Sequence, residues 1–548
     1  MSCLLHSLQL KALLLHSFVL FHASSFSWCL SPTNPTLSPH ANLTTDFGRI
    51  IYNYPNEAFQ PQSPQDISQL LKSISSSPNR NNVTVAARGV GHSTYGQAQA
   101  LNGIVIGMRS LTPYIQIGEA QLVASKNSTF YVDAGGGALW IEVLKETMKH
   151  GLTPRSWTDY LYLTVGGTLS NAGISGQAYK YGPQIANVME VDVVTGKGDI
   201  VTCSEMENSD LFYGVLGGLG QFGIITRARI VLEPAPRRVK WARVPYDDFN
   251  QFTADEEQLI KLGDVNYLEG FITFKDNSPS NVYYTLEFAI YYNDEGDAQK
   301  TLDRVLSQLN FSMSMPNITD VSYFDFLNRV KAEEESLRKK GLWEVPHPWL
   351  TLFVPRNQIG RFKDLLLRTT LEANTPIAGP IIIYPTLKDK WNQNMSAVLP
   401  QANSEENVFY AVSVLRSSPP SCTPGSPCLE SFLNQNQKII EVATAEPTTN
   451  KATATVDATA RKTKTPMSHP RAEIIQKTES MRMEVRTEAG DEGGMGAKQY
   501  LPYYKDQNGW RLHFGEKWGR FEELKSRFDP LNILAPGQRI FQRKPLEG

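Results

Sequence analysis

Apolar and polar positions alternate most regularly between Val282 and Tyr292. Side chains two positions apart share one face of a strand, so this period predicts a single β-strand. One face of it carries apolar and aromatic residues, namely Val282, Tyr284, Leu286, Phe288, Ile290 and Tyr292. The other face includes Glu287, and a glutamate in the middle of a strand is typical of a face that is open to water. The pattern therefore predicts a half-buried sheet.

Shorter patterns in the first half of the chain predict helices and strands in turn. Residues 63–74 predict a helix that begins with a Ser-Pro pair, which is typical of a capped first turn. Residues 138–150 predict a second helix, which ends before Gly151. Residues 188–195 and 199–203 predict the strands of a hairpin. This mixture indicates an α+β fold rather than a regular βαβ repeat.

The segment 441–497 differs from the rest in composition. Thr, Ala, Lys, Glu and Arg dominate it, aromatic residues are absent, and bulky apolar residues are scarce. Such a segment buries too little apolar surface to offset the entropy lost on ordering. We predict a disordered insertion, which is either a tolerated surface loop or a translated intron.

Length and charge narrow the classes of protein. The chain has 548 residues, which indicates more than one domain, and it is 41% hydrophobic and 20% charged, as ordinary globular proteins are. A formal net charge of −2 gives no reason to expect nucleic acid or a membrane surface as a partner. No zinc spacing occurs among the cysteines, so no metal site is predicted, whereas Cys422 and Cys428 can pair locally.

The first residues and the glycosylation motifs predict export. Residues 1–27 resemble a secretory signal peptide, with an apolar run followed by small residues. The run is too short and too interrupted for a membrane anchor. Acceptor motifs for N-glycosylation begin at Asn42, Asn82, Asn127, Asn310, Asn317 and Asn394.

Candidate chemistry lies in the loop 88–93, which reads Arg-Gly-Val-Gly-His-Ser and follows a short β-branched strand. Gly89 and Gly91 leave room for a backbone to approach a bulky ligand, and such a loop offers N–H groups to a pyrophosphate beside the imidazole of His92. A lone histidine after a glycine turn is more often an ordinary loop residue. The loop alone therefore does not identify a site.

A second glycine motif is misleading. Residues 218–223 fit G-x-G-x-x-G, which binds dinucleotides only when a helix follows it. Here the alternating residues 224–232 predict a strand instead. A nicotinamide-binding Rossmann domain is therefore not expected.

Taken with later motifs, the loop resembles that of the plant cytokinin dehydrogenases. The resemblance rests on R-G-V-G-H-S at 88–93, S-W-T-D-Y-L-Y-L-T-V-G-G-T-L-S-N-A-G at 156–173, G-G-L-G-Q-F-G-I-I-T-R-A-R at 217–229 and P-G-Q at 536–538. These are flavoenzymes of the vanillyl-alcohol oxidase/p-cresol methylhydroxylase (VAO/PCMH) fold. The resemblance implies a two-domain fold, with an FAD-binding domain over 28–235, an α+β cytokinin-binding domain over 236–440, and a segment over 498–548 that returns to the FAD domain.

The resemblance also implies the residues of the site. It places FAD covalently on the ring of His92. It places the following residues around the flavin: Ala87, Gly89, Val90, Gly91, Ser93, Gln97, Asp159, Thr164, Ser170, Ile174, Ile225, Tyr500, Ala535 and Gln538. The family commonly has serine where Ala535 stands. It assigns Glu287, Trp391 and Leu501 to the substrate pocket.

The implied reaction is oxidation of N6-isoprenoid cytokinins to adenine and an aldehyde. Loss of hydride from a carbon beside a secondary amine leaves a cationic imine, so a carboxylate that accepts the N–H can orient the substrate and take the proton. The resemblance assigns this role to Asp159 and implies that Glu287 is the second catalytic carboxylate. From the residues alone, Asp159 is typical of a turn aspartate.

Two alternatives stay open at this stage. Another flavin oxidase of the same fold would typically carry a second, cysteinyl flavin link, and no cysteine lies between 164 and 176. A secreted binding protein, impaired as an enzyme by the 441–497 insertion, would hold the hormone without turnover. For the enzyme we expect a quinone-type or other electron acceptor, a monomer, and secretion to the apoplast, with the vacuole as the alternative.

Overall fold

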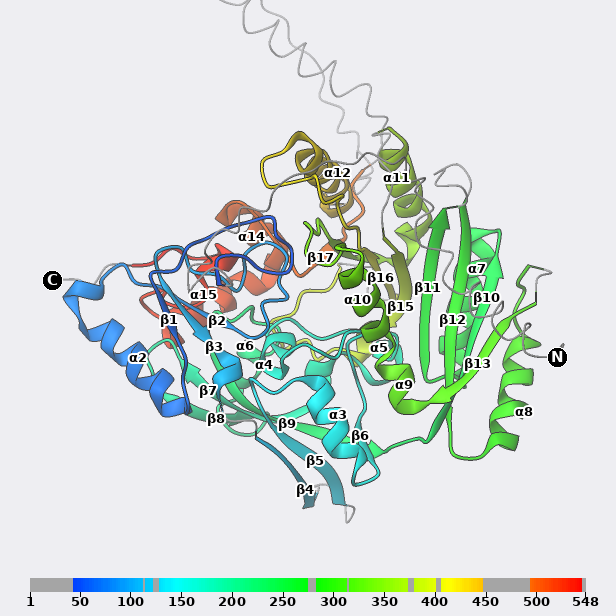
Figure 1. Ribbon diagram of the computed structural model, residues 1–548, viewed down its shortest axis with the longest axis horizontal. Helices are drawn as coiled ribbons and strands as arrows, with labels where there is room; N and C mark the ends of the chain where they lie inside the picture. The colour runs from blue at the N-terminus through cyan, green and yellow to red at the C-terminus, as the bar shows by residue number, and fades with distance from the viewer. Residues whose placement is uncertain are drawn as a thin grey trace, which may run out of the picture.

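The computed structural model describes residues 43–111, 114–121, 128–274, 282–312, 315–372, 379–400, 406–446 and 493–544. Within these ranges the chain forms two lobes built on three β-sheets (Figure 1). The first lobe contains a small parallel sheet and a six-stranded sheet, and the second lobe contains an eight-stranded sheet. The predicted signal peptide, residues 1–27, lies outside the described residues.

The small sheet of the first lobe has the order β1-β3-β2. Its strands are β1 (Glu57–Phe59), β2 (Val85–Arg88) and β3 (Ile104–Gly107), and α2 (Pro64–Ser76) covers it. Ser63 caps α2 by accepting from the Asp66 N–H, and the Asp66 carboxylate accepts in return from the Ser63 N–H. The helix predicted over 63–74 is therefore confirmed.

The larger sheet of the first lobe has the order β4-β5-β9-β7-β8, with β6 paired to β9. The strands are β4 (Ile115–Gln121), β5 (Ser128–Gly135), β6 (Leu152–Pro154), β7 (Val188–Thr195), β8 (Ile200–Ser204) and β9 (Gly223–Pro234). Its helices are α3 (Trp140–Met148), α4 (Val165–Leu169), α5 (Ala178–Tyr181) and α6 (Ser209–Val215). The pairing of β7 with β8 confirms the predicted hairpin. Helix α3 confirms the helix predicted over 138–150, and β9 confirms the strand predicted after the second glycine motif.

The second lobe is an eight-stranded sheet with the order β13-β10-β12-β11-β15-β16-β14-β17. Its strands are β10 (Arg238–Tyr246), β11 (Tyr267–Phe274), β12 (Val282–Tyr292), β13 (Asn317–Ser322), β14 (Leu350–Pro355), β15 (Ile381–Leu387), β16 (Val408–Val414) and β17 (Lys498–Tyr500). Its helices are α7 (Phe249–Leu262), α8 (Glu295–Leu306), α9 (Tyr323–Leu327), α10 (Arg329–Lys339), α11 (Ile359–Glu372) and α12 (Pro427–Thr444). The bounds predicted for the strand 282–292 are confirmed by β12.

The prediction that the second face of β12 is open to water is wrong. Glu287 is only 1% exposed, and Ala289 on the same face is fully buried. One face of the sheet packs against helices such as α7 and α8, and the other packs against the first lobe. A strand that is covered on both faces buries its polar positions too, and alternation alone does not reveal this.

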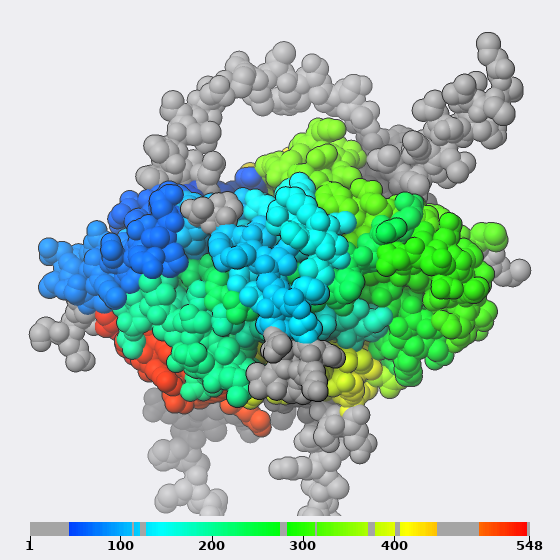
Figure 2. Space-filling model, turned by 90° about the horizontal axis from the view of Figure 1, so that it is seen from below, coloured from blue at the N-terminus to red at the C-terminus, as the bar shows by residue number. Residues whose placement is uncertain are grey.

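The last part of the chain crosses back to the first lobe. After β17 it forms α14 (Gln507–Phe514) and α15 (Trp518–Phe528), and α15 packs against α6. Figure 2 shows this segment in red on the blue-to-teal lobe, with the green residues of the second lobe beside it. Single turns of 3-10 helix occur at Pro78–Arg80, Met108–Ser110, Gln184–Asn187, Arg356–Gln358, Lys388–Lys390, Gly515–Lys517 and Pro536–Gln538.

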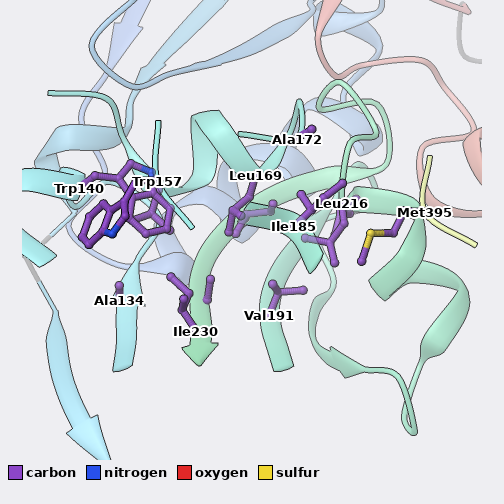
Figure 3. Packing of buried hydrophobic residues seen from close by; sticks show 14 of the residues in the cluster. Ala134, Trp140, Trp157, Leu169, Ala172, Ile185, Val191, Leu216, Ile230 and Met395 are labelled. Carbon is purple, nitrogen blue, oxygen red and sulfur yellow. The ribbon is translucent and has the colours of Figure 1, made fainter. Parts of the chain in front are cut away.

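The main core joins the two lobes. Figure 3 shows its first-lobe part, where Trp140 and Trp157 meet edge to face with centroids 5.7 Å apart. The same cluster takes in Tyr267, Phe353 and Tyr384 from the sheet of the second lobe. Since both lobes bury apolar side chains in one cluster, their facing surfaces are fixed relative to each other.

The edges of the predicted insertion 441–497 need correction. Helix α12 continues to Thr444 and buries Ala443, and beyond the gap Met495 and Ala497 are buried just before β17. Residues 441–446 and 493–497 therefore belong to the fold. The rest of the predicted insertion, residues 447–492, lies outside the described residues.

The cysteines at 422 and 428 form a disulfide, as the sequence allowed. Among the helices within the described ranges, none combines the length and the apolar character needed to cross a membrane.

Candidate active site

The loop that carries His92 leaves the end of β2 and lies against the start of α4. A Cβ on Gly89 would stand 2.1 Å from Oγ1 of Thr164, the residue that precedes α4. Gly91 has a φ of +70°, and a Cβ there would meet the guanidinium of Arg88 at 2.2 Å. Glycine is required at both positions, by close contact at the first and by backbone conformation at the second.

Asp46 holds this loop from behind. Its Oδ2 accepts from Ser93 Oγ at 2.8 Å and from the Gly96 N–H at 2.6 Å. The neighbouring Phe47 N–H donates to the Gly91 carbonyl at 2.8 Å. Burial raises the pKa of Asp46 to about 6, and the bond from Ser93 opposes that shift. The loop is thus fixed before any ligand binds.

The front of the loop presents free backbone donors. Within the residues that the structure describes, the N–H groups of 90–94 have no hydrogen-bond acceptor. A run of free N–H groups in a glycine turn forms a concave site for an anion such as a pyrophosphate. Val90 itself is 42% exposed.

His92 lies in a stack of rings. Its ring is 4.0 Å from that of Phe47, which is in turn 4.1 Å from that of His347. Burial lowers the pKa of His92 to about 3, and the nearby His347 adds to the effect. Neither ring nitrogen of His92 bonds to a residue in the described ranges. The imidazole is therefore neutral near pH 7 and keeps a lone pair available for bonding.

Residues 533–538 close the site from the other side. The Val85 N–H donates to the Ile533 carbonyl at 2.8 Å, and the Ala535 N–H donates to the Val85 carbonyl at 2.9 Å. A Cβ on Gly537 would stand 2.1 Å from the Gly96 carbonyl oxygen. Gln538 is 6% exposed, and its Oε1 has no partner among the described residues. This contact joins positions more than 400 residues apart, as the resemblance implied.

Other residues implied for the flavin lie on or beside α4. The Gly166 N–H donates to the Gly136 carbonyl at 2.9 Å, and a Cβ on Gly136 would stand 2.1 Å from the Ile225 carbonyl oxygen. Ser170 Oγ donates back to Gly166, and Tyr500 OH accepts from the Gly173 N–H at 3.1 Å. The rest are placed as follows: Ala87 is exposed at the end of β2, Gln97 Oε1 accepts from the Tyr95 N–H, and Ile174 is half-buried.

Asp159 lies on the loop between β6 and α4 and faces the second lobe. Its Oδ1 accepts from Ser175 Oγ at 2.7 Å, from Arg329 Nη2 at 3.0 Å and from Tyr267 OH at 3.3 Å. These partners come from three separate parts of the chain. A turn aspartate would bond its own backbone instead, so the structure favours a role for Asp159 beyond the local turn.

Two glutamates lie behind Asp159 in the sheet. Glu269 of β11 and Glu287 of β12 are direct cross-strand partners, so both face the first lobe. Arg243 Nε donates to Glu287 Oε2 at 2.7 Å, whereas Glu269 lies 3.8 Å from the Arg329 guanidinium that Asp159 also contacts. Burial raises the pKa of Glu269 well above its usual range, and the nearby charge of Asp159 adds to this. Glu269 is therefore the glutamate more directly coupled to Asp159.

Sequence reasoning missed Glu269, Arg329 and Asp46. Glu269 does carry a signal, because it is a charged residue in the apolar run of β11. Arg329 has no such signal, since an arginine in a charged helix is ordinarily solvated.

Trp391 and Leu501 lie on the far side of Tyr500. Trp391 is 5% exposed and contacts the ring of Phe353, which is 5.2 Å from that of Tyr500. Leu501 has a φ of +56° and lines a small cavity with Phe353 and Tyr500. Burial raises the pKa of Tyr500, and the nearby charge of Asp159 adds to the effect, so the carboxylate and these apolar side chains lie near the same tyrosine.

Comparison with known proteins identifies the family. A family model described as "FAD binding domain" matches residues 55–204, and one described as "Cytokinin dehydrogenase 1, FAD and cytokinin binding" matches residues 236–282 and 273–541. "Cytokinin dehydrogenase 3" of Oryza sativa subsp. japonica is 44% identical over 539 residues, which cover 94% of this chain and 91% of that protein. The chain belongs to the cytokinin dehydrogenase family.

Other cytokinin dehydrogenases match over a similar length. "Cytokinin dehydrogenase 8" of Oryza sativa subsp. indica is 42% identical, covering 99% of this chain and 100% of that protein. "Cytokinin dehydrogenase 1" of Arabidopsis thaliana is 42% identical, covering 92% of this chain and 81% of that protein. With its FAD-binding domain, this cytokinin dehydrogenase is an FAD-dependent oxidoreductase.

Solved structures show the same fold at low sequence identity. A chitooligosaccharide oxidase superposes with a TM-score of 0.59 at 14% identity, covering 94% of this chain and 97% of that one. A VAO-type flavoprotein from Myceliophthora thermophila C1 also gives 0.59 at 14% identity, covering 88% and 79%. The VAO/PCMH-type fold expected from the sequence is therefore confirmed.

The residues of this site fit FAD. The free N–H groups of 90–94 suit its pyrophosphate, and the buried Oε1 of Gln538 has no donor among the described residues. FAD binding is thus supported by this chain's own geometry as well as by its family.

Proposed function

We propose that this cytokinin dehydrogenase oxidises N6-isoprenoid cytokinins and releases adenine and an aldehyde. FAD, when bound, supplies the two-electron acceptor for the hydride. The observation that carries the proposal is Asp159, a partly exposed carboxylate that is anchored at one oxygen and lies near Tyr500, which lines a small cavity with the apolar Phe353 and Leu501. The purine amine is an N–H donor and its isoprenoid tail is apolar, so both parts of the substrate find a matching surface.

The protein's own residues prepare the bond that breaks. Asp159 accepts the N–H of the substrate amine and so holds the adjacent carbon in one orientation. As hydride leaves that carbon, the amine nitrogen becomes cationic, and the same carboxylate stabilises it and takes its proton. Water then adds to the resulting imine, and the carbon–nitrogen bond breaks to give adenine and the aldehyde.

The test is product formation by the purified, full-length protein. We expect isopentenyladenine to give adenine and 3-methylbut-2-enal when a quinone or a dye is supplied as electron acceptor. Tight binding of isopentenyladenine with no aldehyde would instead support the binding protein considered from the sequence. The near-complete match to cytokinin dehydrogenases does not favour that alternative.

We propose further that FAD is attached covalently to His92. A neutral imidazole without a partner among the described residues, held in place by Phe47 and Asp46, suits bond formation to a flavin carbon. Flavin colour should stay with acid-precipitated wild-type protein and should be lost from His92→Ala. Colour that stays with precipitated His92→Ala would show that another residue carries the link.

We propose that the protein is secreted as a monomer to the apoplast, with the vacuole as the alternative, and passes its electrons to a quinone-type or other acceptor. The Cys422–Cys428 disulfide suits an oxidising compartment, and Asn82, Asn310, Asn317 and Asn394 are all exposed. Protein from plant cells should lose mass on treatment with an N-glycosidase, and light scattering should give the mass of one chain.

A further inference from the structure

Asp159 is held by one of its two carboxylate oxygens. The three hydrogen bonds from Ser175, Arg329 and Tyr267 all end on Oδ1. In the part of the chain that the structure describes, no hydrogen bond reaches Oδ2. The side chain of Asp159 is 30% exposed, whereas that of Arg329 is 14% exposed. The carboxylate therefore has an anchored oxygen and an open one.

Arg329 makes two kinds of contact from its place at the start of α10. Nη1 donates to the Phe326 carbonyl at 3.2 Å, at the end of α9, while Nη2 donates to Asp159. The guanidinium also lies 4.8 Å from the centre of the Tyr267 ring. The bond to Phe326 caps α9, but that role needs only one nitrogen. The first turn of α10 disfavours a cation, because the helix dipole is positive there.

The charges around Asp159 single out Arg329. The other titratable groups that face Asp159 or Arg329 are Tyr267 and Glu269 of β11, Tyr384 of β15, Tyr500 of β17, Glu287 of β12 and Glu333 of α10. Burial raises the pKa of the three tyrosines and of Glu269, which favours the neutral form of each. Arg243 forms an ion pair with Glu287. Among the described residues, Arg329 is the cation in contact with Asp159.

We propose that Arg329 is a positioning residue for the oxidation, which holds Oδ1 of Asp159 and leaves Oδ2 to accept the substrate N–H. This inference rests on the function proposed above for Asp159. Its consequence is that the substrate meets a preformed carboxylate and does not have to displace the arginine. The rotation of Asp159 is also restricted, since Ser175 and Arg329 hold Oδ1 from two directions.

The test is the rate of flavin reduction by isopentenyladenine as a function of pH, measured by stopped flow without oxygen. In Arg329→Gln, the acidic limb of the profile should move to higher pH by about one unit or more, because an adjacent arginine favours the charged carboxylate by that order. Arg329→Lys should restore the position of the limb, but with a lower plateau rate, since an ammonium cannot bond Phe326 and Asp159 together in the planar geometry of arginine.

The matched control is Arg356→Gln, which removes a cation that pairs with a buried glutamate, Glu257, on the other face of the same sheet. Its profile should stay at the wild-type position. Flavin absorbance and the unfolding temperature should first show that each variant is folded and loaded. A loaded Arg329→Gln protein with the wild-type limb would overturn the inference, and so would a loss of rate that Arg329→Lys does not relieve at any pH.

The failure of this inference can be told apart from failure of the proposed function. If Asp159→Asn reduces its flavin at nearly the wild-type rate, Asp159 is not the acid–base group and the function assigned to it is wrong. If Asp159→Asn is slow and Arg329→Gln shows no shift, only the role of Arg329 is wrong. In Asp159→Asn, the further change Arg329→Gln should not move the profile, because the coupled carboxylate is already absent.

Discussion

Two groups of buried carboxylates lie on opposite faces of the eight-stranded sheet. On the face toward the first lobe, Glu269 of β11 lies near Asp159 and Arg329. On the face covered by α7, the side chain of Glu256 lies against Gly270, which follows Glu269 in β11. A Cβ on Gly270 would stand 2.6 Å from Glu256 Oε1. Successive residues of a strand point to opposite faces of the sheet, so the two groups of carboxylates lie on opposite faces although Glu269 and Gly270 are adjacent in β11.

Both glutamates respond to burial in the same way. Burial raises the pKa of Glu256 and that of Glu269 well above the usual range, and a nearby carboxylate adds to the effect in each case. Glu256 is fully buried, and neither of its carboxyl oxygens has a partner in the described part of the chain. Its neighbour Glu257 is bonded by Arg356 and Tyr410.

The difference lies in what each neutral glutamate faces. Glu269 stands beside Asp159, a partly exposed carboxylate with its own arginine, and its raised pKa favours the neutral form. Glu256 faces Phe252 and the closed core under α7. A perturbed pKa therefore indicates a functional site here only in combination with an accessible charged partner.

The sharpest test of this comparison removes one charge from each face. Asp159→Asn should slow flavin reduction by isopentenyladenine by roughly 10²-fold or more, the usual effect of removing a positioned base. Glu256→Gln should stay within about twofold of wild type, since it touches no part of the site. Stopped-flow reduction of both variants measures the contrast. Equal losses in the two variants would contradict the distinction between the faces.

A smaller effect is expected for Glu269→Gln. The raised pKa of Glu269 favours its neutral form, so the neutral amide of Glu269→Gln mainly changes one hydrogen-bonding group. The rate of flavin reduction should fall by no more than about tenfold, which corresponds to a single hydrogen bond. A loss as large as that of Asp159→Asn would mean that Glu269 acts in its charged form.

On the closed face, the expected effect is on stability and not on rate. Burial raises the pKa of Glu256 well above the 4.5 of an unperturbed glutamate, which favours its protonated form in the folded protein. Its favourable contribution is therefore present below about pH 4.5 and is lost as the pH rises toward the folded pKa. Glu256→Gln removes the free-energy cost of burying an ionisable carboxyl at high pH. Its melting temperature should therefore exceed that of wild type by roughly one to a few degrees at pH 8.

The pH dependence supplies the control for that variant. The advantage of Glu256→Gln should shrink as the pH falls toward 5, and differential scanning calorimetry at several pH values follows it. An advantage that is constant with pH would point to packing in place of ionisation.

The smallest effect is expected for the cation on the closed face. The side chain of Arg356 is 47% exposed, so its ion pair with Glu257 is largely solvated. Arg356→Gln should lower the free energy of unfolding by about 1 kcal/mol or less. Urea unfolding of the folded holoenzyme provides the measurement, and a loss of several kcal/mol would mean that Glu257 depends on this arginine.

The sequence predicted well what is local and poorly what depends on contacts across the fold. The cap at Ser63, the hairpin of β7 and β8 and the bounds of β12 follow from residues within a few positions of one another. The burial of Glu287 does not, because the first lobe covers that face. Alternation reports which residues share a face but not what packs on it.

The site shows the same division. The glycine loop and Asp159 could be named because family motifs surround them. Arg329 could not, since its bond to Asp159 spans 170 positions and its own surroundings are those of a charged helix. The edges of the 441–497 segment were also misjudged, because the helical turn that ends at Thr444 gains its stability from burying Ala443 in the second lobe.

The pairing of residues 533–535 with Val85 bears on the order of events during biosynthesis. A ribosome delivers β2 and the His92 loop more than 400 residues before it delivers the segment that pairs with them. The cofactor site thus cannot be completed until residues 533–538 have left the ribosome. We expect a truncated product that lacks residues 530–548 to retain no flavin.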